Sequence, residues 1–171
     1  MVEIGTILSF IQAFGIIVGV AYYILNIQNN QRNQKLSFES QRQTLETRQA
    51  QLFMQSFNLW LSSGYDNKLT ELMYRQEWND YDDWKEKYGP ITNPQAASNY
   101  TAVDTFFEGL GTLVKRNLID PELVDDLMGG DIVAYWSKMR PIAEGVRRDY
   151  VPTFAENSEY LYNVVKKIYE K

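Results

Sequence analysis

The sequence predicts an all-α protein: one N-terminal transmembrane helix that continues into a long polar helix, followed by a compact cytoplasmic helical domain. The first observation is the uncharged apolar run Ile4–Ile27, which as a helix of roughly 36 Å would cross a hydrocarbon core of about 30 Å. The second is that later apolar residues recur at three- and four-residue steps, without sustained alternation of period two. We expect a transmembrane helix over 1–28, a polar helical stalk over 29–56 and a helical soluble domain over 57–171.

The apolar run is predicted to be a retained span and not a cleaved signal peptide. A signal peptide combines a basic first segment with an apolar stretch of about 7–15 residues. This chain has no Lys or Arg before Arg32, and its apolar stretch is longer, although Gly19-Val20-Ala21 offers small residues of the kind that a signal peptidase reads. One retained span implies a protein of the cell membrane.

The flanks of the run predict its orientation. Only Glu3 is charged before it, whereas four basic residues follow within a short distance: Arg32, Lys35, Arg42 and Arg48. The positive-inside rule then places the N-terminus outside and the C-terminal domain in the cytoplasm. The absence of cysteine agrees with a reducing compartment and excludes disulfides.

One continuous helix is expected from Ile4 to Ser62, because only glycines interrupt the helix formers there and the first proline is Pro90. Gly64 suits the left-handed position after its C-terminus. One heptad column of this helix is mostly apolar: Ile24, Phe38, Leu45, Leu52 and Leu59. The second column of a coiled-coil seam is missing, so two alternatives stay open: the stalk self-associates, or it packs on its own domain.

Capping residues and apolar stripes divide the soluble domain into helices. The first is expected over Asn67–Trp78 with Asp66 as N-cap, and a short helical piece follows over 79–88. After a loop at Gly89–Pro94, a strongly amphipathic helix should run to Asn117.

Three further helices are expected after Asn117. A short one starts at Asp120-Pro121 and stops at Gly129-Gly130, and Asp131 caps the next, which Pro141 should kink. A capping box, Thr153-x-x-Glu156, should open the last helix.

Composition narrows the possible functions. Without His or Cys, and without a phosphate-binding glycine motif, the chain cannot build the usual nucleophile relays or zinc sites, so we expect no enzyme, no cofactor, no metal site and no catalytic residue. Residues 57–171 carry 13 basic and 19 acidic side chains, and a net charge of −6 argues against nucleic-acid binding. Asp80, Asp82 and Asp83 lack the further ligands of a calcium loop, and Asp80 is better explained as an N-cap.

The order of these segments resembles a known family. A short N-terminal tail, one span, a polar helix and a Trp-Tyr-Trp segment precede FFEGLGTLVKRNLIDPELVDDLMGGDIVAYW, which covers Phe106–Trp136. This arrangement is similar to a family of uncharacterised single-span, membrane-anchored helical domains from bacteria and archaea, a domain of unknown function. The resemblance implies the fold class and the single anchor, and it supplies no activity and no catalytic residues.

Two glycine pairs are the candidate contact sites. Gly15 and Gly19 leave a flat strip in the span where another helix can approach, and we expect Ala13 and the polar Gln12 to belong to the same helix–helix contact. Gly109 and Gly111 interrupt a strong helix, where they either let a helix of the same domain cross closely or admit a partner.

The function predicted from these features is a non-enzymatic, single-pass scaffold or accessory subunit of a membrane assembly. Its expected partners are the lipid bilayer and a second copy of itself, another membrane protein, or both. One alternative is a homo-oligomeric pore formed by the single spans, with Gln12 lining its axis. A second is a membrane-anchored hydrolase that depends on carboxylates alone.

Overall fold

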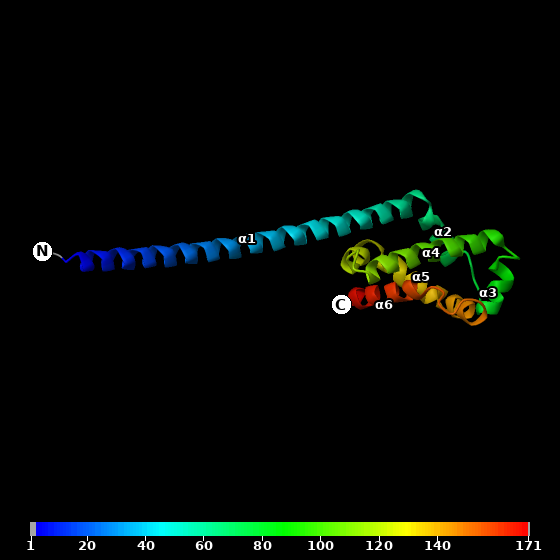
Figure 1. Cartoon of the computed structure of the whole chain (residues 1–171). Helices are drawn as coiled ribbons and strands as arrows, with labels where there is room; N and C mark the ends of the chain where they lie inside the picture. Colours follow the sequence, from blue (N-terminus) through cyan, green and yellow to red (C-terminus); the bar gives the residue numbers. More distant parts are fainter. Residues whose placement is uncertain (1–2, 171) are drawn as a thin grey trace. The chain divides into compact units, whose positions relative to one another are not determined.

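The computed structural model describes residues 3–170 and contains six α-helices, with no β-strand among these residues (Figure 1). The helices are α1 (Ile4–Ser62), α2 (Tyr65–Tyr74), α3 (Tyr81–Tyr88), α4 (Pro94–Lys115), α5 (Pro121–Asp149) and α6 (Glu156–Tyr169). The predicted fold class is confirmed: a long N-terminal helix that begins apolar is followed by a helical domain.

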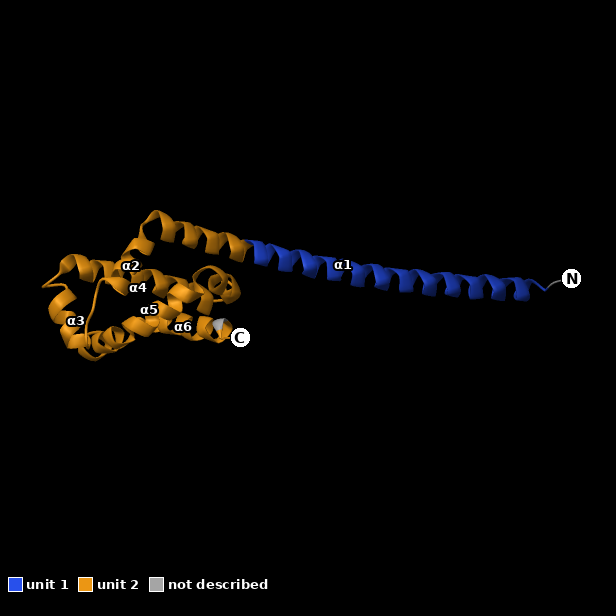
Figure 2. Ribbon diagram, turned by 180° about the vertical axis from the view of Figure 1, so that it is seen from behind, with its two compact units in different colours: residues 1–47 blue, residues 48–171 orange. Residues whose placement is uncertain are grey.

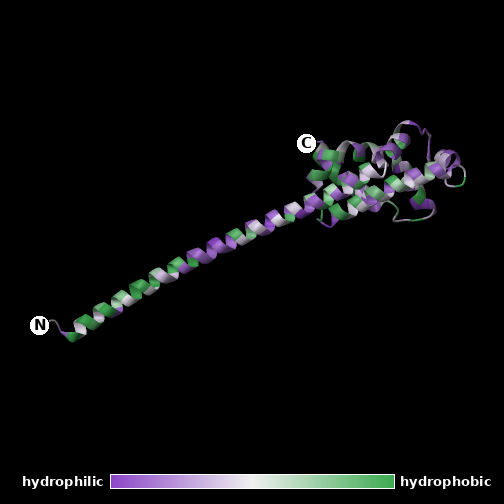
Figure 3. Ribbon diagram, turned by 90° about the horizontal axis from the view of Figure 1, so that it is seen from above, coloured by the Kyte–Doolittle hydropathy of each residue, from purple (hydrophilic) through white to green (hydrophobic). Residues whose placement is uncertain are grey.

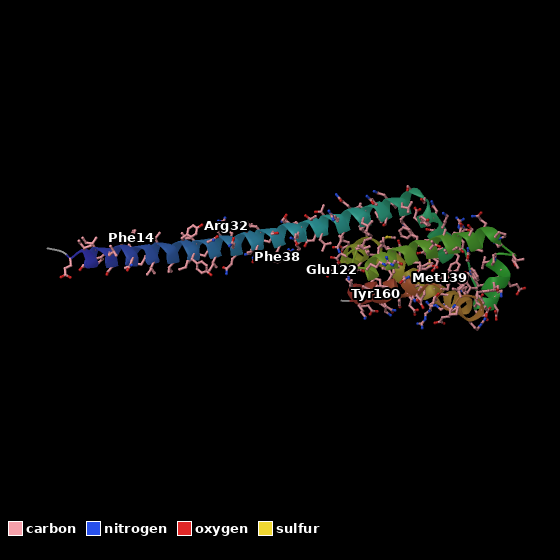
Figure 4. The ribbon with its side chains drawn as sticks, in the orientation of Figure 1. Phe14, Arg32, Phe38, Glu122, Met139 and Tyr160 are labelled. Carbon is pink, nitrogen blue, oxygen red and sulfur yellow. The ribbon has the colours of Figure 1, made fainter. Side chains whose placement is uncertain are left out.

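The chain divides into two compact units, residues 1–47 and 48–171 (Figure 2). In the first unit every described side chain is exposed, and the hydropathy of α1 changes from apolar to polar along its length (Figure 3). Figure 4 shows Phe14, Arg32 and Phe38 pointing outward from this helix. Among residues 3–170, α1 is the one helix long and apolar enough to cross a membrane, a criterion that a signal sequence near the N-terminus also meets.

The second unit is built around α4. This helix packs against α2, α3 and α6, while α5 packs against α2, α3 and α6. Val103, Phe107 and Leu110 from α4 lie in one buried cluster with Tyr135 and Met139 from α5. Burial of these apolar faces is the main term that holds the helices together.

The last turns of α1 belong to this second core. Phe53 and Trp60 are buried, and the Trp60 ring lies 5.2 Å from the ring of Phe107 and 4.8 Å from that of Phe106, measured between centroids. Leu59, from the apolar heptad column of the sequence, is half exposed. The stripe of α1 that packs on the domain is therefore displaced by one residue from that column.

Several helix ends are confirmed where a short-range signal decides them. Helix α1 has the predicted bounds, and Gly64 after it has φ 66°, in the left-handed region that glycine adopts without strain. Asp80 caps α3 by accepting from the Asp83 amide at 2.9 Å, and Asp120 caps α5 by accepting from the Glu122 amide at 2.9 Å.

The predicted break at Gly129-Gly130 is wrong, because α5 runs without interruption through both glycines and through Pro141. Each glycine costs about 1 kcal/mol in a helix, but neither removes a backbone donor. Gly129 is buried with Val165 of α6 beside it, so tertiary packing outweighs that local cost. Asp131 is thus an interior residue of α5 and no N-cap.

Three more predicted helix ends are wrong. Helix α2 stops at Tyr74 and not at Trp78, and it begins at Tyr65, so Asp66 lies in its first turn and is not its N-cap. Helix α6 begins at Glu156 after Ala155, which has φ 55° and caps nothing with its side chain, so the Thr153-x-x-Glu156 capping box is absent. The side chains that cap these two helices come from other helices: Lys138 of α5 caps the end of α2, and Glu108 of α4 caps the start of α6.

Candidate functional site

The residues of α1 that are predicted to contact another helix are exposed. Gly15 and Gly19 have nothing within 4 Å of the position of an added Cβ, among the described residues. At about 100° per residue, Gln12, Gly15 and Gly19 share one side of α1. Ala13 falls roughly 160° from Gly15, so it lies on another side of the helix than the two glycines. The strip available to a partner is therefore made of Gln12, Gly15 and Gly19.

The second glycine pair divides by environment. Gly111 is buried, and a Cβ added there would collide with the backbone carbonyl of Asn157, so it lets α4 and α6 approach closely. Gly109 is exposed, with nothing within 4 Å of an added Cβ among the described residues. Gly111 thus faces α6, whereas Gly109 faces open space.

Glu108 supplies the cap that α6 lacks in its own sequence. Its carboxylate on α4 accepts from the backbone amides of Asn157 at 2.9 Å and Ser158 at 2.8 Å, and from the Asn157 side-chain amide at 2.7 Å. These are first-turn amides of α6 that would otherwise lack acceptors, and a carboxylate there is also favoured by the helix dipole. Gly111, one turn along α4, admits the backbone that Glu108 holds.

A buried carboxyl joins three helices beside this cap. Asp104 of α4 accepts from the Tyr135 hydroxyl of α5 at 3.2 Å, and the Ser158 hydroxyl of α6 lies 3.5 Å from the same oxygen. Burial raises the pKa of Asp104 to about 7, although the hydrogen bonds from Tyr135 and Ser158 oppose this. The sequence signal that would have revealed it is an acid one turn after Tyr100, inside the apolar stripe of α4.

Lys138 of α5 explains why α2 ends early. Its ammonium donates to the backbone carbonyls of Leu72, Met73 and Gln76 at 2.9, 2.7 and 2.8 Å, which uses all three of its protons. It also lies 4.7 Å from the centre of the Trp78 ring. Burial lowers the pKa of this ammonium. Lys138 is thus the C-terminal cap of a neighbouring helix and is not merely a solvated charge.

One aromatic pocket of about 600 Å³ opens where α3, α4 and the end of α5 meet. Its aromatic lining comes from α3, α4 and the turn after α5: Tyr81, Trp84, Tyr100, Tyr150 and Phe154. Gly145 sets one wall, because a Cβ there would collide with the Tyr81 ring. A pocket of this size and apolar character is suited to a small molecule. Sequence reasoning missed it because its walls come from four separate segments.

The acids near α3 make contacts that the sequence only partly predicts. Among the described residues, no cluster of three or more Asp, Glu, His or Cys side chains is arranged to hold a metal ion. Asp83 instead accepts from the Asn79 amide at 2.9 Å and from Lys87 at 2.9 Å, which lowers the pKa of its carboxyl. The acids of α3 thus take part in helix capping and ion pairing.

With the architecture and these contacts defined, comparison with known proteins places the chain in a family. Residues 9–165 match the family described as "Domain of unknown function (DUF4760)". The chain belongs to the DUF4760 family. No curated protein and no solved structure matches the chain significantly.

The DUF4760 match begins within the apolar segment of α1 and ends in α6. It therefore includes Gln12, Gly15 and Gly19 as well as the whole lining of the aromatic pocket. The family description indicates no catalytic function.

Proposed function

We propose that this DUF4760 protein is a non-enzymatic, single-pass membrane protein whose helical domain acts as a scaffold or accessory subunit of a membrane assembly. The observation that carries the proposal is the apolar segment Ile4–Ile27, in which every side chain is exposed. Apolar surface of this extent is unfavourable in water, at roughly 25 cal/mol per Å². A bilayer would remove it from water along the whole length of the segment.

The proposed orientation places residues 48–171 in the cytoplasm of the cell. Arg32, Lys35, Arg42 and Arg48 follow the span closely, and basic residues are retained on the cytoplasmic side. Anionic lipid headgroups would attract the same side chains there.

The strip of Gln12, Gly15 and Gly19 supports an assembly within the membrane. Lipid tails are as apolar as leucine, so helices associate there through close backbone packing and polar contacts, which two glycines and one amide provide. The partner is a second copy of the chain, another membrane protein, or both. An amide in the hydrocarbon region is also what a water path would need, which keeps a homo-oligomeric pore as the second candidate.

The first experiment tests the anchor and its direction. Protease added to intact cells should leave the domain whole, and protease added to inverted vesicles should degrade it. The mature protein should also keep the mass of the full chain in the membrane fraction. A shortened chain in the soluble fraction would identify α1 as a cleaved signal sequence, and the reverse protease pattern would refute the orientation.

The second experiment tests the assembly. The double variant Gly15→Leu/Gly19→Leu should still insert, because leucine is favourable in the bilayer, but it should elute from mild detergent as a smaller species. Ala21→Leu is the matched control, because residue 21 lies roughly 160° from Gly19 around the helix. Extra chains that co-purify with the wild type favour the accessory subunit, and a ring of identical chains favours the pore. An unchanged size for the double variant would refute the glycine contact.

A further inference from the structure

We propose that the aromatic pocket binds a small, flat aromatic acid, with its ring system between the aromatic side chains and its carboxylate at Lys85. This ligand site is independent of the proposed membrane role, because the pocket is formed by residues 81–154 alone. The proposal depends on three features: the shape and lining of the pocket, its unpartnered hydrogen-bonding groups, and the sign of the charge at its aromatic faces.

The lining favours a flat ring. Trp84 lies against Tyr81 in a stacked arrangement, with ring centres 6.4 Å apart, and against Tyr100 edge-to-face at 5.2 Å. Tyr100 in turn lies 6.3 Å from Phe154. These rings line the pocket, and an aromatic guest gains more from aromatic surfaces than an aliphatic guest of equal area.

Two buried side chains of the lining carry hydrogen-bonding groups that have no partner among the described residues. They are the indole Nε1 of Trp84 and the hydroxyl of Tyr100, and each residue is only 4 % exposed. Burial raises the pKa of Tyr100 well above its ordinary value, so the phenol is neutral and can donate. Unpartnered buried donors are rare in folded proteins, and a ligand with oxygen acceptors would give these two a partner.

The charge at the aromatic faces is positive. The Lys85 ammonium lies 5.2 Å from the centre of the Tyr150 ring and 5.8 Å from that of Tyr81. Its nearest carboxylate, Asp149, is 3.8 Å away and itself accepts from Arg148 at 2.8 Å. Two acids, Asp82 and Glu86, also line the pocket, and both are exposed. The Asp82 side chain is 82 % exposed and lies 3.8 Å from Arg148.

The cations that lie over the Tyr81 and Tyr150 rings favour an anionic ligand over a cationic one. A cationic ligand would compete with Lys85, and with Arg148 at 5.5 Å from the Tyr81 ring, for ring faces that these residues already occupy. An anion would instead give Lys85 a second partner, because its one ion pair among residues 3–170 is with a carboxylate shared with Arg148.

The test uses three probes of one shape and three charges: indole-3-acetate, indole-3-acetamide and tryptamine. Each is titrated by calorimetry into the full chain in lipid nanodiscs, with empty nanodiscs subtracted. The acid should bind most tightly, followed by the amide and then the amine. Lys85→Met should weaken the binding of the acid by about fivefold, which is the contribution of one partly exposed ion pair. The same variant should leave the binding of the amide unchanged. Lys167→Met, an exposed lysine of α6 outside the pocket, should change neither.

A blocking variant tests the location separately. Thr101 is exposed on α4 and lines the pocket, so Thr101→Trp should weaken the acid and the amide alike, by about tenfold or more, without disturbing the core. Thr105→Trp, one turn further along the same exposed side of α4, should bind as the wild type does. The proposal is overturned if tryptamine binds more tightly than the acid, if Thr101→Trp binds normally, or if no probe binds at about 1 mM.

Discussion

The apolar half of α1 and helix α4 share a pattern of residues, but among residues 3–170 the pattern is mostly covered by neighbouring helices in α4 and exposed in α1. Each has an apolar stripe that includes a pair of glycines and a polar side chain: Gln12 with Gly15 and Gly19 in α1, and Asp104 with Gly109 and Gly111 in α4. In α4 the polar group is hydrogen-bonded and one glycine lies against α6. In α1 all three residues are exposed. In α4 the buried glycine and the buried acid both mark contacts with other helices. The proposed membrane assembly would cover the corresponding residues of α1 with another molecule.

The largest effect on the free energy of unfolding should come from Asp104, the buried acid of α4. Below its folded pKa of about 7, Asp104 keeps its proton, whereas the unfolded chain loses it from about pH 4 upward. The contribution of Asp104 to the free energy of unfolding should therefore decrease as the pH rises from 4 to 7, by up to about 4 kcal/mol, and then level off. Asp104→Asn keeps an acceptor for Tyr135 but cannot titrate, so it should remove this slope.

The measurement is urea unfolding of residues 36–171 at pH 4 to 8, since this range includes the whole second unit with Phe53. Asp126→Asn, at an exposed position of α5, controls for the loss of one carboxylate. The same pH dependence in the wild type and in Asp104→Asn would show that Asp104 is ionised in the folded protein. Asp104 would then be a buried charge, and it would no longer be comparable with the uncharged Gln12 of α1.

The two glycines of α4 should respond with opposite signs. Gly111→Ala forces a methyl group against the Asn157 backbone, which cannot rotate away, and should destabilise the domain by about 2 kcal/mol. Gly109→Ala meets no atom and should stabilise it by about 1 kcal/mol, through helix propensity alone. Thermal unfolding of both variants checks the pair. Equal effects would mean that the α4–α6 contact is looser than described.

The smallest effect is expected from Gln12. In the membrane, a side-chain hydrogen bond between helices contributes about 0.6 kcal/mol on average, so Gln12→Leu should weaken the assembly by about threefold. Energy transfer between labelled chains at increasing dilution in detergent or lipid would measure this change. A tighter assembly would indicate that Gln12 lies outside the contact and that the two glycines act alone.

The sequence predicts an element well where the deciding signal lies close along the chain. The bounds of α1 and the caps Asp80 and Asp120 depend on residues within one turn, and they are confirmed. The errors arise where the deciding group is distant. Lys138 ends α2 from more than 60 residues away, and Glu108 caps α6 from 49 residues away.

The candidate sites follow the same division. The strip of Gln12, Gly15 and Gly19 can be found from spacing within one helix, because a helix fixes which residues share a side. The aromatic pocket cannot be found in this way, because α3, α4, the end of α5 and two turns contribute to it, and only the tertiary fold brings them together. Asp104 is intermediate, since its place in an apolar stripe is visible in the sequence but its partners Tyr135 and Ser158 are not.

The cap that Glu108 provides also bears on the order in which the protein forms during synthesis. The ribosome releases the chain from its N-terminus, so α1 emerges first and α6 last. Glu108 has no backbone amides of α6 to bind until that last segment appears, and α4 keeps one side uncovered until then. The apolar segment Ile4–Ile27 therefore leaves the ribosome well before α6 can pack on α4 and complete the domain. A chain arrested just short of residue 156 should be open to proteases and chaperones in a way that the finished protein is not.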